Sequence, residues 1–205
     1  MKNIKTLIMA AAIGLLALST MAGTPDPYPV YTATGVDVGT TLNYAIIGCH
    51  SSNAGTPVLT YLNFISDHAT PIATFYKAGT PIMVTGANTT TSIPAATNSI
   101  AGYVGAGIIV IQHMATDTYE RRILGTCTST AIVVTVAPTT ATAAGDRIWL
   151  CTADGTISGV QNTVREVVGT GIFAGQANKP LLIDLNNTTS AAAVNINCAT
   201  ATFVK

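Results

Sequence analysis

Charged side chains are scarce in this chain of 205 residues. Only 9% of its residues are Asp, Glu, Lys or Arg, whereas about 25% is typical of globular proteins. The polar surface therefore has to come mainly from Thr, Ser, Asn and Gln. No basic run or stripe is present, which excludes the electrostatic footprint of a nucleic-acid-binding protein. Intrinsic disorder is also excluded, because 48% of the residues are hydrophobic and the formal net charge is zero.

Long apolar runs are missing after residue 22. Residues 1–22 have Lys2 and Lys5 near the start, an apolar stretch over 7–18 and small residues at the end, which is the form of a secretory signal peptide. The alternative is an uncleaved apolar arm that is buried in an assembly. The stretch is shorter than the roughly 20 residues of a membrane span, so we predict no stable membrane span in the mature chain.

Residues 23–41 are rich in proline and predict an extended arm. Pro25, Pro27 and Pro29 alternate with other residues, which blocks a helix and favours polyproline-like geometry. Such an arm either packs on a neighbouring subunit or serves as a linker.

The remainder of the chain alternates between short apolar stretches and turn-forming residues. Its β-branched side chains and glycines suit strands and tight turns, and the only helical signal is a short turn over 66–69. Residues 88–98 are polar and low in complexity, which predicts an exposed loop or a boundary. Strands are expected at 42–46, 58–65, 72–76, 81–85, 108–113, 119–124, 132–136, 147–151, 164–168, 181–185 and 194–198.

About ten to thirteen short strands predict an all-β fold, an antiparallel β-sandwich or barrel with an extended N-terminal arm. The alternative is two small β domains, a first β region over 42–95 and a second over 96–205. Within the second region, the block 107–151 predicts a meander of consecutive strands. The Asp-Gly pair in 153–159 then predicts a turn.

The four cysteines show no metal-binding spacing. None of Cys49, Cys127, Cys151 and Cys198 lies within four residues of another, so there is no CxxC pair. Cys127 and Cys151 flank the strand at 132–136 and are the first candidate disulfide if the protein is exported. The alternative is that all four cysteines are buried free thiols of a protein assembled in a reducing cytosol.

The three histidines lack partners for catalysis. Cys49 and His50 are adjacent on a strand and would point to opposite faces. His68 lies in a polar loop, and His113 and Asp117 flank a turn across which they could touch. One imidazole and one carboxylate are too few for a metal site, which normally has at least three protein ligands. We therefore expect surface or hairpin histidines and no metal.

The sequence GTGIFA over 169–174 matches the spacing of a dinucleotide-binding loop. That loop would have to open a helix whose N-terminus holds the phosphates. Pro180 follows six residues later and 181–185 is strand-like, so we interpret these glycines as turn and bulge residues. No other motif indicates catalysis, and we predict a non-enzymatic protein without a cofactor.

The densest charge cluster is Glu120-Arg121-Arg122. On a strand, Glu120 and Arg122 share one face and Arg121 points to the other, which predicts a cross-strand ladder of ion pairs. The same block holds Tyr119 and the single tryptophan, Trp149. We take Trp149, Tyr119, Arg121 and Arg122 as candidate core or subunit-interface residues.

Four segments, 61–76, 107–126, 137–157 and 178–185, together carry one pattern. They contain a strand ending in the turn ATD, an arginine-bearing return strand, a strand of Thr and Val, and then AAGDRI. Together they resemble β-rich phage virion proteins that decorate capsids or form head fibres. The resemblance implies a non-enzymatic virion component that forms a homo-oligomer such as a trimer and binds a capsid protein.

The signal-like residues 1–22 favour a different class of protein. This alternative is a secreted or periplasmic β-protein of a bacterium, or one on the bacterial cell surface. Its role would be adhesion or glycan binding, and a surface-layer protein would take the place of the capsid protein as its partner. Neither class implies a nucleic-acid partner.

Overall fold

The structure is a computed structural model that describes the backbone of residues 28–29, 31–37, 40–48, 55–66, 70–95, 100–103, 106–187 and 194–204. These ranges hold thirteen strands and no helix, which confirms the all-β prediction. The strands are β1 (Tyr28–Pro29), β2 (Tyr31–Asp37), β3 (Thr40–Ile47), β4 (Thr56–Ser66), β5 (Pro71–Met83), β6 (Ser92–Pro94), β7 (Ile108–His113), β8 (Thr118–Ile123), β9 (Ala131–Val133), β10 (Arg147–Ser158), β11 (Arg165–Ala174), β12 (Leu181–Asn187) and β13 (Val194–Val204).

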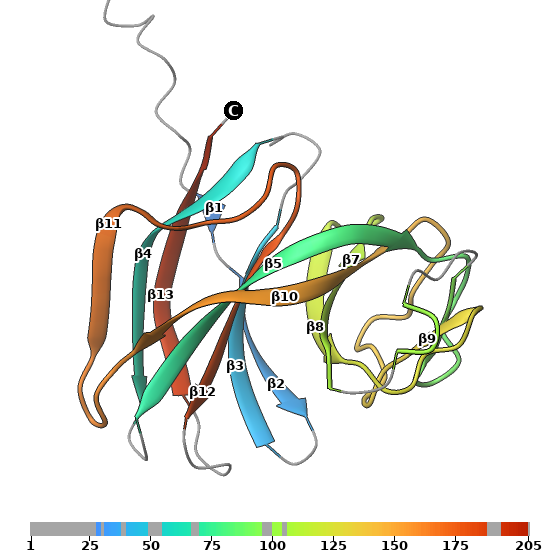
Figure 1. Cartoon of the computed structure of the whole chain (residues 1–205), viewed down its shortest axis with the longest axis horizontal. Helices are drawn as coiled ribbons and strands as arrows, with labels where there is room; N and C mark the ends of the chain where they lie inside the picture. The colour runs from blue at the N-terminus through green and yellow to red at the C-terminus, as the bar shows by residue number, and fades with distance from the viewer. Residues whose placement is uncertain are drawn as a thin grey trace, which may run out of the picture.

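The strands form three antiparallel sheets. The largest has the order β2-β3-β12-β5-β10-β7-β8, and β8 returns close to β2 and β3, so this sheet is nearly closed and barrel-like. A four-stranded sheet has the order β1-β13-β4-β11, and β6 pairs with β9 in a small third sheet. In Figure 1 the four-stranded sheet lies on the left and the lobe around β9 on the right, with β5 and β10 running between them.

Strands β5 and β10 are longer than the sequence pattern predicts. The stretches 72–76 and 81–85 belong to one strand of 13 residues, and β10 continues over 12 residues to Ser158. The turn predicted at 153–159 is therefore wrong. Pairing with β5 continues on both sides of the Asp-Gly pair, and a register shift between Ala153 and Gly155 absorbs the irregularity. Pairing along a long neighbouring strand thus outweighs a local turn preference.

The block 107–151 contains one hairpin instead of a complete meander. Strands β7 and β8 pair through the turn 114–117, as the sequence predicts. The strand expected at 132–136 is reduced to β9, which pairs with β6, and β10 lies on the other side of β7. The meander prediction is wrong beyond its first hairpin. Strand β6 also lies within 88–98, the predicted exposed loop, and its Ile93 is fully buried.

Strands of the two predicted β regions share the same sheets. Strand β5, from 42–95, pairs with β10 and β12 from 96–205, and β4 pairs with β11 and β13. The described part of the proline-rich arm 23–41 pairs within its own chain, because β1 adds to β13 and β2 adds to β3. The signal-like residues 1–22 lie outside the described residues.

Both faces of the seven-stranded sheet carry clusters of buried side chains. The sheet curls so that one of its faces, the inner face, encloses the barrel core. The outer face is covered by the four-stranded sheet over one half and by the β6–β9 lobe over the other half. The barrel core is Tyr44, Ile46, Ala78, Val110, Trp149, Cys151 and Leu182. The inter-sheet core is Ala45, Ile47, Leu59, Leu62, Phe64, Ala73, Phe75, Leu181, Ile183 and Leu185. The lobe core is Ile82, Val84, Ile93, Ala95, Ile100, Ile109, Ile111, Leu124, Cys127, Ile132, Val134 and Ile148.

Alternation along single strands explains how one strand serves two cores. In β12, Leu182 belongs to the barrel core, whereas its neighbours Leu181 and Ile183 belong to the inter-sheet core. In β7, Val110 belongs to the barrel core and Ile109 to the lobe core. The nearly continuous apolar runs of these strands are therefore typical of a sheet that is buried on both faces.

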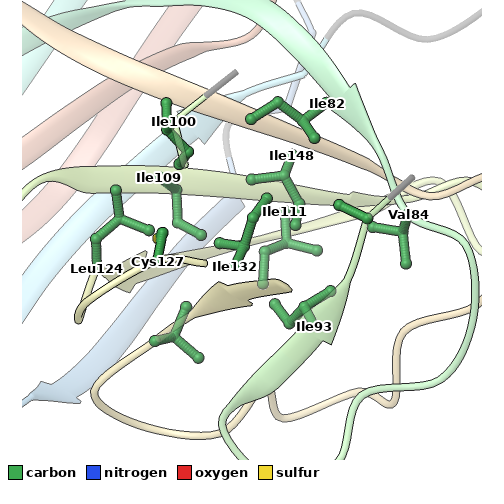
Figure 2. Packing of buried hydrophobic residues seen from close by; sticks show 12 residues of the cluster. Ile82, Val84, Ile93, Ile100, Ile109, Ile111, Leu124, Cys127, Ile132 and Ile148 are labelled. Atoms are coloured by element: carbon green, nitrogen blue, oxygen red, sulfur yellow. The ribbon is translucent and has the colours of Figure 1, made fainter. Parts of the chain in front are cut away.

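The lobe core is built from side chains far apart in the sequence. Figure 2 shows Ile109 and Ile111 of β7 and Ile148 of β10 on one side, with Ile93 and Ile132 of the small β6–β9 sheet on the other. All five side chains are fully buried. A two-stranded sheet is only marginally stable by itself, so packing against β7 and β10 is what holds this lobe in place.

Replacing Ile111 with Ala should lower the free energy of unfolding by about 2–5 kcal/mol, because it leaves a cavity among fully buried side chains. Urea denaturation measures this change. The matched control is Val168→Ala, which removes methyl groups from a side chain that is 71% exposed and should change the stability by no more than about 0.5 kcal/mol. Equal effects of the two substitutions would contradict the assignment of the lobe core.

Candidate functional site

Strand β8 carries charges on both of its faces. On the outer face, Arg122 Nη2 lies 2.6 Å from Glu120 Oε2. On the inner face, Arg121 Nη2 lies 3.0 Å from Asp184 Oδ2 of β12. This distribution agrees with the alternation predicted from the sequence. We refer to Arg121 and Asp184 as the inner pair.

The outer cluster consists of His113, Glu120, Arg122 and Asp146, all of which are buried. His113 bridges two carboxylates, with Nε2 lying 2.8 Å from Glu120 Oε1 and Nδ1 lying 3.1 Å from Asp146 Oδ2. An ionised carboxylate only accepts hydrogen bonds. Both ring nitrogens therefore have to donate, and the arrangement fits the doubly protonated imidazolium form of His113.

The connection between β9 and β10, residues 134–146, is fastened to β8 by this cluster. Glu120 Oε2 accepts a hydrogen bond from the backbone N–H of Thr139 at 2.9 Å. Arg122 donates to the carbonyl of Ala137 at 3.1 Å and to the hydroxyl of Thr139 at 2.7 Å. Two side chains of one strand thus bind a segment that forms no strand of its own.

Asp146 fixes the other end of the same connection. Its Oδ1 accepts from the backbone N–H of Met114, and its Oδ2 accepts from that of Ala143, both at 2.9 Å. Its carbonyl accepts from the N–H of Val84 at 2.9 Å, while the Gly145 N–H donates to the Val84 carbonyl at 3.0 Å. A φ of 96° at Gly145 places this backbone in a region that favours glycine. Asp146 is therefore held from three segments of the chain.

Hydrogen bonds and neighbouring charges shift two pKa values in the outer cluster. The hydrogen bond to Glu120 is the main cause that raises the pKa of His113 above its ordinary value of 6.5, and the bond to Asp146 adds to it against the effect of burial. Burial alone would raise the pKa of Glu120. The His113 hydrogen bond, the Thr139 N–H and the Arg122 charge outweigh burial and lower that pKa below 4.5. Both shifts favour the charged forms.

The prediction for His113 is wrong in two respects. Its side chain is only 4% exposed, and its carboxylate partners are Glu120 and Asp146 instead of Asp117 across the turn. Strand β10 pairs with β7, so a residue 33 positions along the chain comes to lie beside the imidazole. His50 and His68 lie outside the described residues.

The inner pair lies beside two tyrosines. Burial raises the pKa of Tyr44, against a hydrogen bond with the backbone of Arg121. Burial, followed by the negative charge of Asp184, raises the pKa of Tyr76. Both phenols therefore stay neutral at ordinary pH. Asp184 was not among the predicted site residues, although a single carboxylate within the apolar run LLIDL indicates a need for a buried partner.

The candidate core or interface residues lie on both faces of the sheet. Trp149 is buried in the barrel core, and its indole Nε1 has no hydrogen-bond partner. Tyr119 accepts a hydrogen bond from Gln112 Nε2 at 2.8 Å. A Cβ atom on Gly48 would collide with the Tyr119 ring, so the glycine allows β8 to approach the end of β3. Arg121 belongs to the inner pair and Arg122 to the outer cluster.

Of the two alternatives for Cys127 and Cys151, a disulfide or buried free thiols, the structure shows the second. Both are buried free thiols, and they belong to different cores, Cys127 to the lobe core and Cys151 to the barrel core. The sheet lies between them. Burial raises the pKa of the Cys151 thiol to about 12. The side chains of Cys49 and Cys198 lie outside the described residues.

Each charged group of the outer cluster and the inner pair is paired with another part of the chain. Within the described residues, no group of three His, Cys, Asp or Glu side chains is placed to hold a metal ion. The glycine motif at 169–174 lies in β11, where the ladder with β4 shifts register between Val168 and Phe173 and Gly171 has a φ of 82°. None of the described segments forms an apolar helix of membrane-spanning length.

Replacing Asp184 with Leu should lower the free energy of unfolding by about 3–5 kcal/mol, because Arg121 would remain as a buried charge without its counter-ion. Urea denaturation measures this loss. The double variant Arg121→Met, Asp184→Leu should recover most of it, since it removes both charges. Asp154→Ala is the control, because its pair with Lys77 is partly exposed and should contribute no more than about 1 kcal/mol. A loss at Asp184 no larger than at Asp154 would contradict the inner pair.

Cys127 and Cys151 should resist alkylation in the folded protein. The thiolate is the reactive form, and burial disfavours it at Cys151. Native protein treated with iodoacetamide at mildly alkaline pH, then digested and mapped by mass spectrometry, should carry label at neither position. Protein unfolded in urea should carry label at both. Rapid native labelling at Cys151 would show that the barrel core opens.

The described contacts thus define two charged groups, one on each face of the seven-stranded sheet, which join segments distant in the sequence. Comparison of the chain with protein-family models, with curated proteins and with solved structures gave no match. The chemistry of the described residues is therefore the basis for the function proposed below.

Proposed function

We propose that this chain is a non-enzymatic structural protein of a virion, of the capsid-decoration or head-fibre type, which binds neighbouring subunits. One observation carries the proposal. The buried charged groups bind other parts of the same chain, whereas large apolar side chains on and beside strand β11 are left exposed. The buried charges are thus paired within the fold, whereas the exposed apolar side chains are available to contact partners.

The distribution of buried charge argues against an enzyme. Catalytic groups have to line an accessible pocket with perturbed pKa values. The histidine and charged side chains that are buried in the described part of the chain are instead joined in ion pairs. They are His113, Glu120, Arg121, Arg122, Asp146 and Asp184.

Three valines define what we call the β11 surface. Val160 is 65% exposed, Val164 is 48% exposed and Val168 is 71% exposed. Among the described strands β11 pairs only with β4, so it forms an edge of the four-stranded sheet. An edge strand presents backbone N–H and C=O groups to another chain, and exposed apolar side chains beside it add area to such a contact. The β11 surface therefore suits contact with a neighbouring subunit.

The composition and the resemblance to phage virion proteins support the same function. A lattice of closely packed subunits disfavours unpaired charges at its contacts, because desolvating them is costly, and only 9% of this chain is charged. Three of the four segments that carry the resemblance also supply the outer cluster and the inner pair. They are 107–126, 137–157 and 178–185. The segments that carry the resemblance are therefore the ones that stabilise the fold.

Val168→Lys should weaken self-association, because a charge on an exposed edge strand opposes contact with another chain. Sedimentation velocity over a series of concentrations compares it with the wild type. The matched control is Val136→Lys, at a valine that is 38% exposed in the connection after β9, which should leave the oligomer unchanged. A wild-type chain that sediments as a monomer at every concentration would refute assembly through the β11 surface.

Mass spectrometry of particles purified from cells that produce the protein separates the virion role from the alternative. Peptides of this chain that co-purify with phage heads support the virion role. Recovery of the chain in the envelope or medium, with residues 1–22 removed, would instead establish the exported adhesion or glycan-binding protein.

A further inference from the structure

We propose that His113 is a pH-sensitive latch, which fastens the end of the connection 134–146 to the β7–β8 hairpin while its ring carries two protons. The latch rests on the contacts of the outer cluster and is independent of the proposed function. It concerns a conformational property of the fold, the attachment of one connection.

The geometry requires two protons on the imidazole. Its nitrogens lie 2.8 Å from Glu120 and 3.1 Å from Asp146, and both partners are acceptors when ionised. A neutral imidazole has a single N–H and can serve only one carboxylate. Its other nitrogen would then present a lone pair to a carboxylate oxygen, and this contact is repulsive.

Asp146 is the contact that opens first. Besides His113, each carboxylate has two further donors: Arg122 and the Thr139 N–H for Glu120, and the N–H groups of Met114 and Ala143 for Asp146. Glu120 makes the shorter bond to His113, 2.8 Å against 3.1 Å for Asp146. The remaining proton therefore stays on Nε2, between His113 and Glu120. The Asp146 carboxylate then faces a deprotonated Nδ1, and this repulsion strains its hydrogen bonds from the N–H groups of Met114 and Ala143, which loosens the end of the connection where β10 begins.

Charged groups lie on each element that packs against the imidazole. Strand β8 contributes Glu120 and Arg122, the connection contributes Asp146, the turn after β7 contains Asp117, and β10 carries Arg147 opposite Gln112.

The direction of the pH dependence follows from the raised pKa of His113. Its contribution is fully present below the ordinary value of 6.5 and is lost as the pH rises through the raised value of the closed state. Between these two limits the closed latch holds one proton more than the open one, so the population of the open state should rise about tenfold per pH unit. At low pH the latch weakens when Glu120, with its lowered pKa, becomes protonated.

Two measurements on the full chain test the latch. The first is a nuclear magnetic resonance titration of the His113 ring, in which both ring N–H protons should be visible at mildly acidic pH and the midpoint should lie above 6.5. The second is limited proteolysis of the connection 134–146 from mildly acidic to mildly alkaline pH. The cleavage rate, relative to an unfolded peptide of the same sequence, should rise about tenfold per pH unit until it levels off.

Variants separate the latch from other titrating groups. His113→Gln removes the titration and should make the relative cleavage rate independent of pH. Asp146→Asn keeps the shape of the side chain but removes its charge, and should lower the His113 midpoint and flatten the cleavage profile. Asp154→Asn is the matched control, because Asp154 pairs with Lys77 at a partly exposed position, and it should keep the wild-type profile. His50 and His68 are present in all variants, so differences between profiles report on His113.

A His113 midpoint below the ordinary value would overturn the proposal, and so would a relative cleavage rate that is the same at both ends of the pH range. If His113→Gln fails to fold, the wild-type titration and the Asp146→Asn comparison still decide. An unchanged His113 midpoint in Asp146→Asn would assign the imidazole to Glu120 alone and refute the latch.

Discussion

The presence of a buried cluster on each face of the seven-stranded sheet is the constraint on which the other features of this structure depend. A sheet with one solvated face could leave its charged side chains in water. Here the inner face closes around the barrel core, and the outer face is covered by the four-stranded sheet and the β6–β9 lobe. A charged residue of β8 therefore meets the protein interior on either side, and it requires a partner there. The outer cluster and the inner pair supply these partners.

The sequence predicts local structure well where alternation and turn chemistry agree. The β7–β8 hairpin and the opposite orientations of Glu120 and Arg121 were predicted on this basis and are found. The turn predicted at 153–159 fails because pairing of β10 with β5 overrides the preference of a Gly residue. The composition of the polar stretch 88–98 does not predict that Ile93 is buried, because its burial depends on packing against the distant β7 and β10.

The partners of the candidate site could be predicted only in part, for a physical reason. Glu120 and Arg122 are two residues apart, so strand periodicity alone brings them together. Asp184 reaches Arg121 across 63 positions, and only the closure of the sheet places β12 near β8. The disulfide considered for Cys127 and Cys151 fails for the same reason, because the fold decides which distant residues meet. Proximity in the sequence suggested a disulfide, whereas the sheet that runs between them places the two thiols in separate cores.

The two charged groups differ in what they do for the fold. The inner pair joins an arginine to a carboxylate and contains no imidazole. The outer cluster contains an imidazole between two carboxylates, and its balance of charge changes with a single proton. A buried network of this kind specifies one arrangement as much as it stabilises it. The inner pair therefore fixes how β8 meets β12, whereas the outer cluster makes the attachment of one connection depend on pH.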